Sequence, residues 1–274
     1  MGNKDQLEYL IKLVDDDTEE VRTEVVNELR HYGTSLEEDL KEFSDIMQPS
    51  KLELLKPILE KNRREWLLQN WSSWISISNE NARLEQAMSL IAQFQFGINY
   101  QPSINKLINE LADEFRTKYP YGTELDLSDF LFGEKQITGN NTDYYNPFNS
   151  NLIYVIKEKK GIPITLAILL ILVANKLGYT IEGCNFPGHF LAKIRLEKDI
   201  LMIDCFNNGK LIYEHDIKKM THGSSETIMR LVEMETSSTT IIRRMINNLT
   251  NAYKNSNEFK QSDFMLEILS KTPL

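Results

Sequence analysis

Apolar side chains recur every three or four residues along the first 115 positions of the chain, which is the spacing of amphipathic helices. The pattern covers residues 7–14, 21–29, 52–68 and 83–115, with a break at residues 97–102. In the Asp-rich turn before the second segment, Asp17 lies three residues ahead of Glu20, a capping-box spacing that predicts where that helix begins. We therefore expect a helical N-terminal part, followed by an irregular stretch at residues 119–150.

The central part of the chain changes from helical to strand-like patterns. Helices are predicted from about residue 151 to 159, with Asn149 or Ser150 as the cap, and from Pro163 to about Lys176. The second of these helices is apolar on every side and must be buried. Strand-like runs follow at residues 180–185, 190–196 and 200–206. The pattern predicts a mostly helical α+β fold, in which the buried central helix packs against a small antiparallel sheet with helical segments on either side.

Composition and charge narrow the classes of function. The 274 residues include 31 Lys and Arg against 40 Asp and Glu, so the formal net charge is −9, which disfavours nucleic-acid binding. The longest uncharged stretch, residues 161–175, is shorter than the ~20 residues of a membrane-spanning helix, and the first ten residues do not resemble a signal peptide. Only two cysteines, Cys184 and Cys205, are present, which excludes a disulfide framework. We expect a cytoplasmic protein that binds neither membranes nor nucleic acid.

Metal and cofactor chemistry has little support in the sequence. His215 and His222 lie seven residues apart with Glu214 and Asp216 nearby, but this is not a recognised metal-ligand spacing. No glycine-rich loop of the kind that cradles phosphates is present. The sequence therefore predicts no metal and no cofactor.

One pair of polar residues in the predicted sheet suggests chemistry. Along the strand near residue 190, His189 shares a face with Leu191 and Lys193, while Asp204 ends the next predicted strand. If the connection between the strands has an even number of residues, His189 and Asp204 lie on the same face of neighbouring strands, opposite or diagonal. An odd connection would separate them. A histidine beside an aspartate is the base and orienting group of a nucleophilic triad, although such a pair on a sheet is more often structural.

Four short motifs resemble those of the SirB-type, transglutaminase-like superfamily, which also occurs as a module in an F-box protein. They are Asn149-Ser150, Gly161-Ile162-Pro163-Ile164-Thr165-Leu166, Asn185-Phe186-Pro187-Gly188-His189-Phe190-Leu191 and Ile203-Asp204-Cys205-Phe206. The resemblance extends over about residues 80–274. It implies a papain-like core in residues 79–236, and residues 237–274 resemble the TPR-like tail of the family.

The remaining segment, residues 1–78, is predicted to be helical. Its first two helices, joined by the Asp-rich turn, resemble one HEAT repeat. No second copy follows in the sequence. An ordinary helical hairpin is therefore the alternative interpretation.

In the family, a nucleophilic cysteine begins the buried helix, and His and Asp come from adjacent strands. His189 and Asp204 match those two positions, whereas Pro163 stands where the cysteine would be. The resemblance thus implies a degenerate triad. The pocket residues that it implies are Asn149, Ser150, Thr165, Cys184, Asn185, Phe186 and Phe206.

The missing nucleophile favours a non-enzymatic role. Thr165 has a hydroxyl near the helix start, and Cys184 lies close to His189 in the sequence, but neither fits the usual geometry; Cys205 is expected to face away from Asp204. We predict a protein-binding or regulatory function with an unidentified protein partner. The alternatives are a thiol-dependent amide hydrolase or acyl transferase that uses His189 and Asp204, and acid–base work by that pair without a covalent step.

Overall fold

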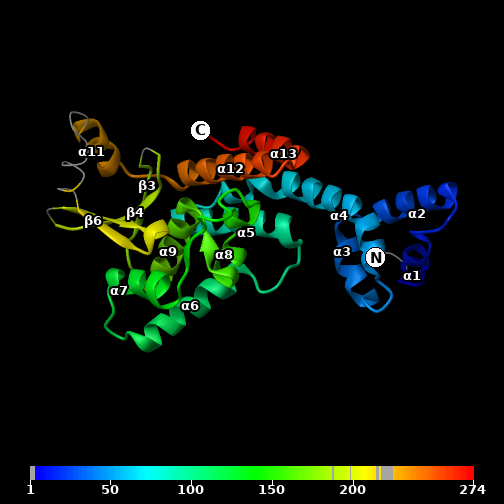
Figure 1. The fold of residues 1–274 in the computed structure, drawn as a ribbon, viewed down its shortest axis with the longest axis horizontal. Coiled ribbons are helices and arrows are strands. Elements are labelled where there is room, and N and C mark those ends of the chain that lie inside the picture. The colour runs from blue at the N-terminus through cyan, green and yellow to red at the C-terminus, as the bar shows by residue number, and fades with distance from the viewer. Residues whose placement is uncertain (1–3, 187, 198, 214–215, 217–224) are drawn as a thin grey trace. The chain divides into compact units, whose positions relative to one another are not determined.

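The computed structural model describes residues 4–186, 188–197, 199–213, 216 and 225–274. These residues form two compact units, one of Met1–Asn70 with Gln93–Gln101 and one of Trp71–Ala92 with Pro102–Leu274. The predicted fold class is confirmed, since the structure is mostly helical with two small sheets (Figure 1). The predicted boundaries at residues 78 and 236 stay predictions.

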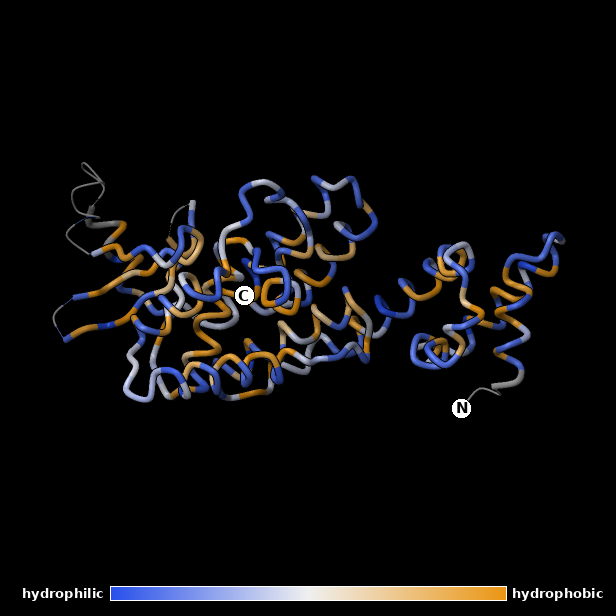
Figure 2. Tube along the Cα trace, turned by 60° about the horizontal axis from the view of Figure 1, so that its bottom comes forward, coloured by the Kyte–Doolittle hydropathy of each residue, from blue (hydrophilic) through white to orange (hydrophobic). Residues whose placement is uncertain are grey.

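The first unit is built from short helices around an apolar core. Its main helices are α1 (Lys4–Leu13), α2 (Glu19–His31), α3 (Leu36–Asp39) and α4 (Pro49–Asn70), with 3-10 turns at Gly33–Ser35 and Leu40–Phe43. The core is formed by the apolar positions that the helical spacing predicts, among them Leu7, Ile11, Val25 and Leu29. In Figure 2, hydrophobic and hydrophilic residues alternate along the helices of this unit.

The predicted capping box of α2 is not formed. The helix begins at Glu19 after Thr18, which makes no side-chain cap. The Asp16 carboxylate instead accepts a hydrogen bond from the Thr18 backbone N–H at 2.9 Å. This local turn places Thr18, rather than Asp17, at the helix boundary.

An ion pair ties α3 to α4 within the first unit. The Arg63 guanidinium donates to both carboxylate oxygens of Glu37, and also to the Gln95 carbonyl at 3.1 Å. The backbone of Gly97 passes so close that a Cβ there would lie 2.5 Å from Glu37 Oε1, and its φ of +125° is one that other residues rarely adopt. A side chain at this position would therefore strain the backbone and displace the Glu37 carboxylate.

The second unit contains the remaining elements. Its helices are α5 (Glu80–Phe96, shared with the first unit), α6 (Ile104–Lys118), α7 (Glu124–Ser128), α8 (Leu152–Glu158), α9 (Pro163–Leu177), α11 (Ser225–Glu233), α12 (Ser238–Asn255) and α13 (Phe259–Ser270). Short 3-10 helices lie at Trp71–Trp74, Pro147–Ser150 and Cys205–Asn207, and a π-helix covers Asp129–Glu134. Helices α12 and α13 pack against each other along their length (Figure 1).

Helix α9 is the centre of this unit. Every residue from Pro163 to Ala174 is buried, as its all-round apolar sequence predicts. It contacts α6, α8, α12 and two strands of the sheet (Figure 1). Gly178, in the left-handed conformation with φ +83°, ends the helix, and the Tyr179 N–H returns to the Ala174 carbonyl at 2.9 Å.

Helix α8 differs from its prediction at both ends. Asn151, not Asn149 or Ser150, is the cap, and its side chain accepts from the backbone of Ile153 at 2.9 Å and of Tyr154 at 3.4 Å. The helix ends at Glu158 because Lys159 adopts a left-handed conformation with φ 57°. The next two residues form β2 (Lys160–Gly161), which pairs in parallel with β1 (Thr138–Gly139).

The larger sheet has four antiparallel strands in sequence order. They are β3 (Glu182–Cys184), β4 (Leu191–Arg195), β5 (Ile200–Asp204) and β6 (Lys210–Tyr213). Ala192 pairs with Ile203 and Lys193 with Met202. Helix α9 contacts β3 and β4, and Val232 of α11 packs on the apolar cluster of Cys184, Leu191, Ile200 and Met202.

Candidate functional site

His189 and Asp204 meet at one end of the β4–β5 hairpin. Arg195 pairs with Ile200, so four residues connect the strands. This is the even connection for which the sequence predicts that His189 and Asp204 share a face, and they occupy diagonal positions. The His189 Nε2 atom lies 2.8 Å from Asp204 Oδ1. The structure thus has the even connection of the two alternatives, and the two side chains are in contact.

Asp204 is held by more than the histidine. Its Oδ1 also accepts from the backbone N–H of Asn207 at 3.2 Å, and its Oδ2 accepts from the Asn207 side-chain amide at 2.7 Å. Burial of the carboxylate opposes ionisation, but the hydrogen bonds from His189 and Asn207 outweigh it and lower the pKa of Asp204. The site therefore contains an ionised, fixed carboxylate that orients the histidine ring.

The other ring nitrogen of His189 is free. Among the residues that the structure describes, Nδ1 has no hydrogen-bond partner, and 26% of the side chain is exposed. The edge of the ring meets Phe206, with ring centres 6.3 Å apart. Since Asp204 takes one nitrogen, the second is available to a ligand as an acceptor, or as a donor when the ring is protonated.

The start of α9 provides no nucleophile. Pro163 is its first residue, and Ile162 before it makes no side-chain cap. The Thr165 hydroxyl is buried and has no hydrogen-bond partner among the described residues. A hydroxyl that is neither exposed nor held by a base cannot attack a bound substrate in this conformation.

Both cysteines are buried thiols. Burial raises the pKa of Cys184 and of Cys205. The Sγ of Cys205 lies 3.8 Å from the carbonyl oxygen of Ile203. Cys184 belongs to the apolar cluster beneath α11. Neither environment favours the thiolate that a nucleophile requires.

The seven predicted pocket residues fall into two groups. Asn149, Ser150, Thr165 and Cys184 are buried in the core. Asn185 is exposed and Phe186 and Phe206 are half-buried, on the two chain segments that carry His189 and Asp204. Asn149 has a supporting role, since its side chain donates to the carbonyls of Asp143 and Tyr144 at 2.7 and 3.1 Å.

Three residues near the pair were not singled out from the sequence. The ring of Tyr144 lies 6.0 Å from that of Phe206. Gly139 allows Phe206 to approach, because a Cβ at this position would lie 2.6 Å from its ring. Arg244 of α12 donates to the carbonyl of His189 at 2.9 Å. Helical and strand periodicities do not encode contacts between segments this far apart, so no local pattern in the sequence indicates these three residues.

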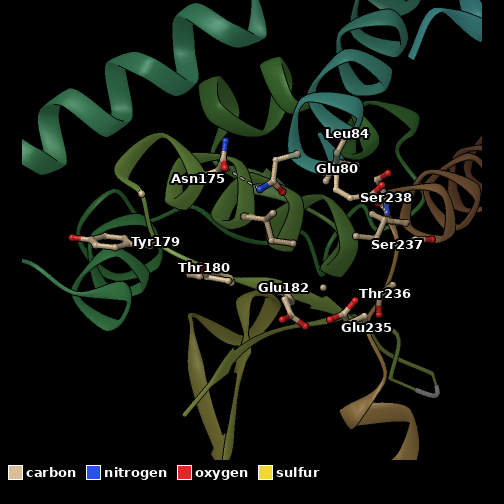
Figure 3. Close-up of a pocket in the computed structure, with 16 residues that line it drawn as sticks. Glu80, Leu84, Asn175, Tyr179, Thr180, Glu182, Glu235, Thr236, Ser237 and Ser238 are labelled. Atoms are coloured by element: carbon tan, nitrogen blue, oxygen red, sulfur yellow. Dashed lines mark hydrogen bonds between the residues drawn. The ribbon is translucent and has the colours of Figure 1, made fainter. Parts of the chain in front are cut away.

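A separate cavity of about 620 Å³ lies on the second unit (Figure 3). It is lined by the start of α5, the end of α9, β3 and residues 235–238, and none of the predicted site residues lines it. Glu80 accepts from the backbone N–H of Ser238 at 2.7 Å, and Glu182 pairs with Arg195 at 2.8 Å. Two of its three carboxylates are thus engaged within the protein.

Metal binding and membrane insertion find no support in the described part of the chain. No group of three or more His, Cys, Asp or Glu side chains there could hold a metal ion. His215, His222 and Glu214, considered as metal ligands from the sequence, lie outside the described residues. No described helix is both long and apolar enough to cross a bilayer.

Comparison with known proteins supports the transglutaminase-like part of the resemblance seen in the motifs. Residues 99–247 match the sequence model of the transglutaminase-like superfamily. A UPF0162 protein of Xylella fastidiosa (strain 9a5c) is 27% identical over 222 residues, which cover 76% of this chain and 79% of that protein. The F-box only protein 21 of Mus musculus is 26% identical over 184 residues, 64% of this chain and 29% of that protein. No solved structure matches.

Proposed function

The chain belongs to the transglutaminase-like superfamily, and from this premise we propose that it is a non-catalytic member that binds or regulates another protein. The observation that supports this proposal is the chemistry of the nucleophile position. Pro163 begins the helix where the family has its cysteine, and the two cysteines of the chain are buried thiols with raised pKa values. The His189–Asp204 pair thus orients an imidazole that has no thiol to activate.

Finer features of the proposal come from the helices that flank the core. We interpret residues 79–236 as a SirB-type core, the packed pair α12–α13 as its TPR-like tail, and the hairpin of α1 and α2 as HEAT-like. Helical pairs of these kinds commonly offer surfaces to other proteins. We further propose that the protein acts in the cytoplasm, where buried free thiols remain reduced.

Alkylation of the cysteines tests the proposal. Iodoacetamide is added to the native protein at several values between about pH 5 and pH 9, and labelling of Cys184 and Cys205 is followed by mass spectrometry. We expect slow labelling of both thiols across this range, because burial raises the pKa of each and blocks the reagent. Protein unfolded in urea is the positive control and labels quickly.

The His189→Ala variant tests whether labelling of the cysteines depends on the histidine. If the histidine activates no thiol, the variant labels as slowly as the native protein. Fast labelling at neutral pH that is lost in His189→Ala would refute the non-catalytic proposal and support a thiol-dependent amide hydrolase or acyl transferase.

A further inference from the structure

The guanidinium of Arg244, on α12, lies against the loop that carries His189. It donates to the Asn185 side-chain oxygen, to the Phe186 carbonyl at 3.4 Å and to the His189 carbonyl at 2.9 Å. It also lies 5.3 Å from the centre of the Phe190 ring. All of these partners are neutral. Within the described ranges, no carboxylate lies within ion-pair distance of Arg244.

Arg244 differs in this respect from two other half-buried arginines of the described chain. Arg63 and Arg83, each with 21% of the side chain exposed, both pair with a glutamate. Arg244 is likewise half-buried, and burial lowers its pKa because no carboxylate stabilises the charge. A guanidinium has five N–H donors, of which three are used here, so donors remain for a further acceptor. On a chain of net charge −9, this is a local positive site.

Aromatic side chains lie next to this cation. The ring of Tyr144 is 6.0 Å from that of Phe206. Phe206 in turn meets the ring of His189, whose Nδ1 has no hydrogen-bond partner within the described ranges. Tyr144 and Tyr145 are 41% and 52% exposed. The surroundings of Arg244 therefore combine a positive charge, an available imidazole nitrogen and exposed aromatic surface.

We propose that Arg244 binds a carboxylate of a peptide ligand, while Tyr144 and Phe206 pack against the apolar atoms beside it. His189 can donate to the same carboxylate through Nδ1 only when its ring is protonated, since Asp204 holds the other ring nitrogen. This inference rests on the proposed protein-binding function and names the chemistry of the partner segment. A guanidinium forms strong, charge-assisted hydrogen bonds with a carboxylate. A monoanion fits better than a phosphate dianion, because Arg244 is the one fixed cation in this group and the Asp204 carboxylate lies directly behind His189.

Two small probes test the proposal on the full chain. The acidic probe is N-acetyl-phenylalanyl-glutamic acid α-amide, and the neutral probe is N-acetyl-phenylalanyl-glutamine amide, so the side-chain charge is the difference between them. Binding is followed by NMR through the Nε–H signal of Arg244 and the ring signals of His189. We expect the acidic probe to shift these signals with an affinity at least about tenfold higher than the neutral probe.

Variants of α12 supply the matched controls. Arg244→Gln removes the charge and should reduce the preference for the acidic probe to about twofold or less, whereas Arg244→Lys should retain part of it. Arg243→Gln should leave it unchanged, since Arg243 donates to the carbonyls of Thr272 and Pro273. If Arg244→Gln does not fold, the affinities of the native protein and of Arg244→Lys for the two probes still test the proposal.

Several results would overturn the carboxylate site. These are equal affinities for the two probes, no response of the Arg244 signal to either, tighter binding of inorganic phosphate than of the acidic probe, or an equal loss in Arg243→Gln. Failure of the proposed function is seen separately. Conversion of the neutral probe to the acidic probe by hydrolysis of its side-chain amide, visible in the same spectra, would show catalysis.

Discussion

Replacement of Asp204 by asparagine measures how much the His189–Asp204 pair stabilises the fold. Oδ1 of Asp204 accepts from His189 and from the Asn207 backbone, and Oδ2 accepts from the Asn207 side-chain amide at 2.7 Å. An asparagine that keeps its oxygen at the first position turns its own amide nitrogen toward that of Asn207, which also donates. The variant loses one hydrogen bond, and two others no longer have a charged acceptor. Part of this cost is offset because an asparagine is easier to desolvate than a carboxylate. We therefore expect the free energy of unfolding to fall by about 2 to 3 kcal/mol.

Urea unfolding at neutral pH, followed by circular dichroism, gives this difference in free energy of unfolding. The exposed Asp113→Asn, whose side chain is 73% exposed, is the control and should change stability by less than about 0.5 kcal/mol. Because the pKa of Asp204 is lowered in the fold, its contribution is fully present above its unfolded pKa of about 4 and is lost as the pH falls through the folded value. A loss for Asp204→Asn no larger than the control, or a difference that grows in acid, would refute this reasoning.

Three further substitutions test other contacts. Gly139→Ala should destabilise the second unit by about 1 to 3 kcal/mol in urea unfolding, since its Cβ would lie 2.6 Å from the ring of Phe206; unchanged stability would contradict the close approach. Lys193→Met should speed hydrogen exchange of the backbone amides of α11 about tenfold or more. The fully buried ammonium of Lys193 donates to two carbonyls at the end of that helix, at 2.8 and 2.6 Å, and the variant loses both hydrogen bonds. Unaltered exchange would show that Lys193 does not hold the helix. Glu37→Gln breaks the half-buried ion pair with Arg63 and should lower the free energy of unfolding of the first unit by about 1 to 2 kcal/mol, measured by thermal unfolding. Unchanged stability would show that the ion pair does not stabilise the unit.

The parts of the fold that could be predicted are those whose pattern is local. The run from Pro163 to Ala174 has no polar face, so burial of α9 follows from the sequence alone. Alternation along two strands predicted that His189 and Asp204 share a face if the connection between the strands is even, and the structure has that even connection. The helix break near Gly97 was also marked by local residues.

The parts that could not be predicted depend on contacts between distant segments. The strands β1 and β2 have two residues each, too few for any periodicity. Lys193 lies on a strand face that alternation assigns correctly, but its burial depends on carbonyls of α11 some forty residues later. Arg244 likewise lies on a helix whose apolar face is evident, whereas its contacts with the His189 loop arise only when that helix packs.

The contact between Arg244 and the His189 loop also bears on how the protein can be divided. His189 and Asp204 both precede residue 236, where the sequence suggests that a core domain ends, yet the carbonyls of Phe186 and His189 accept from a side chain beyond that point. A fragment cut at residue 236 would contain the whole dyad and lack the donor that fixes its loop. A fragment meant to keep the His189 loop in this arrangement should therefore include at least α12, whether the chain is truncated, transplanted or fused.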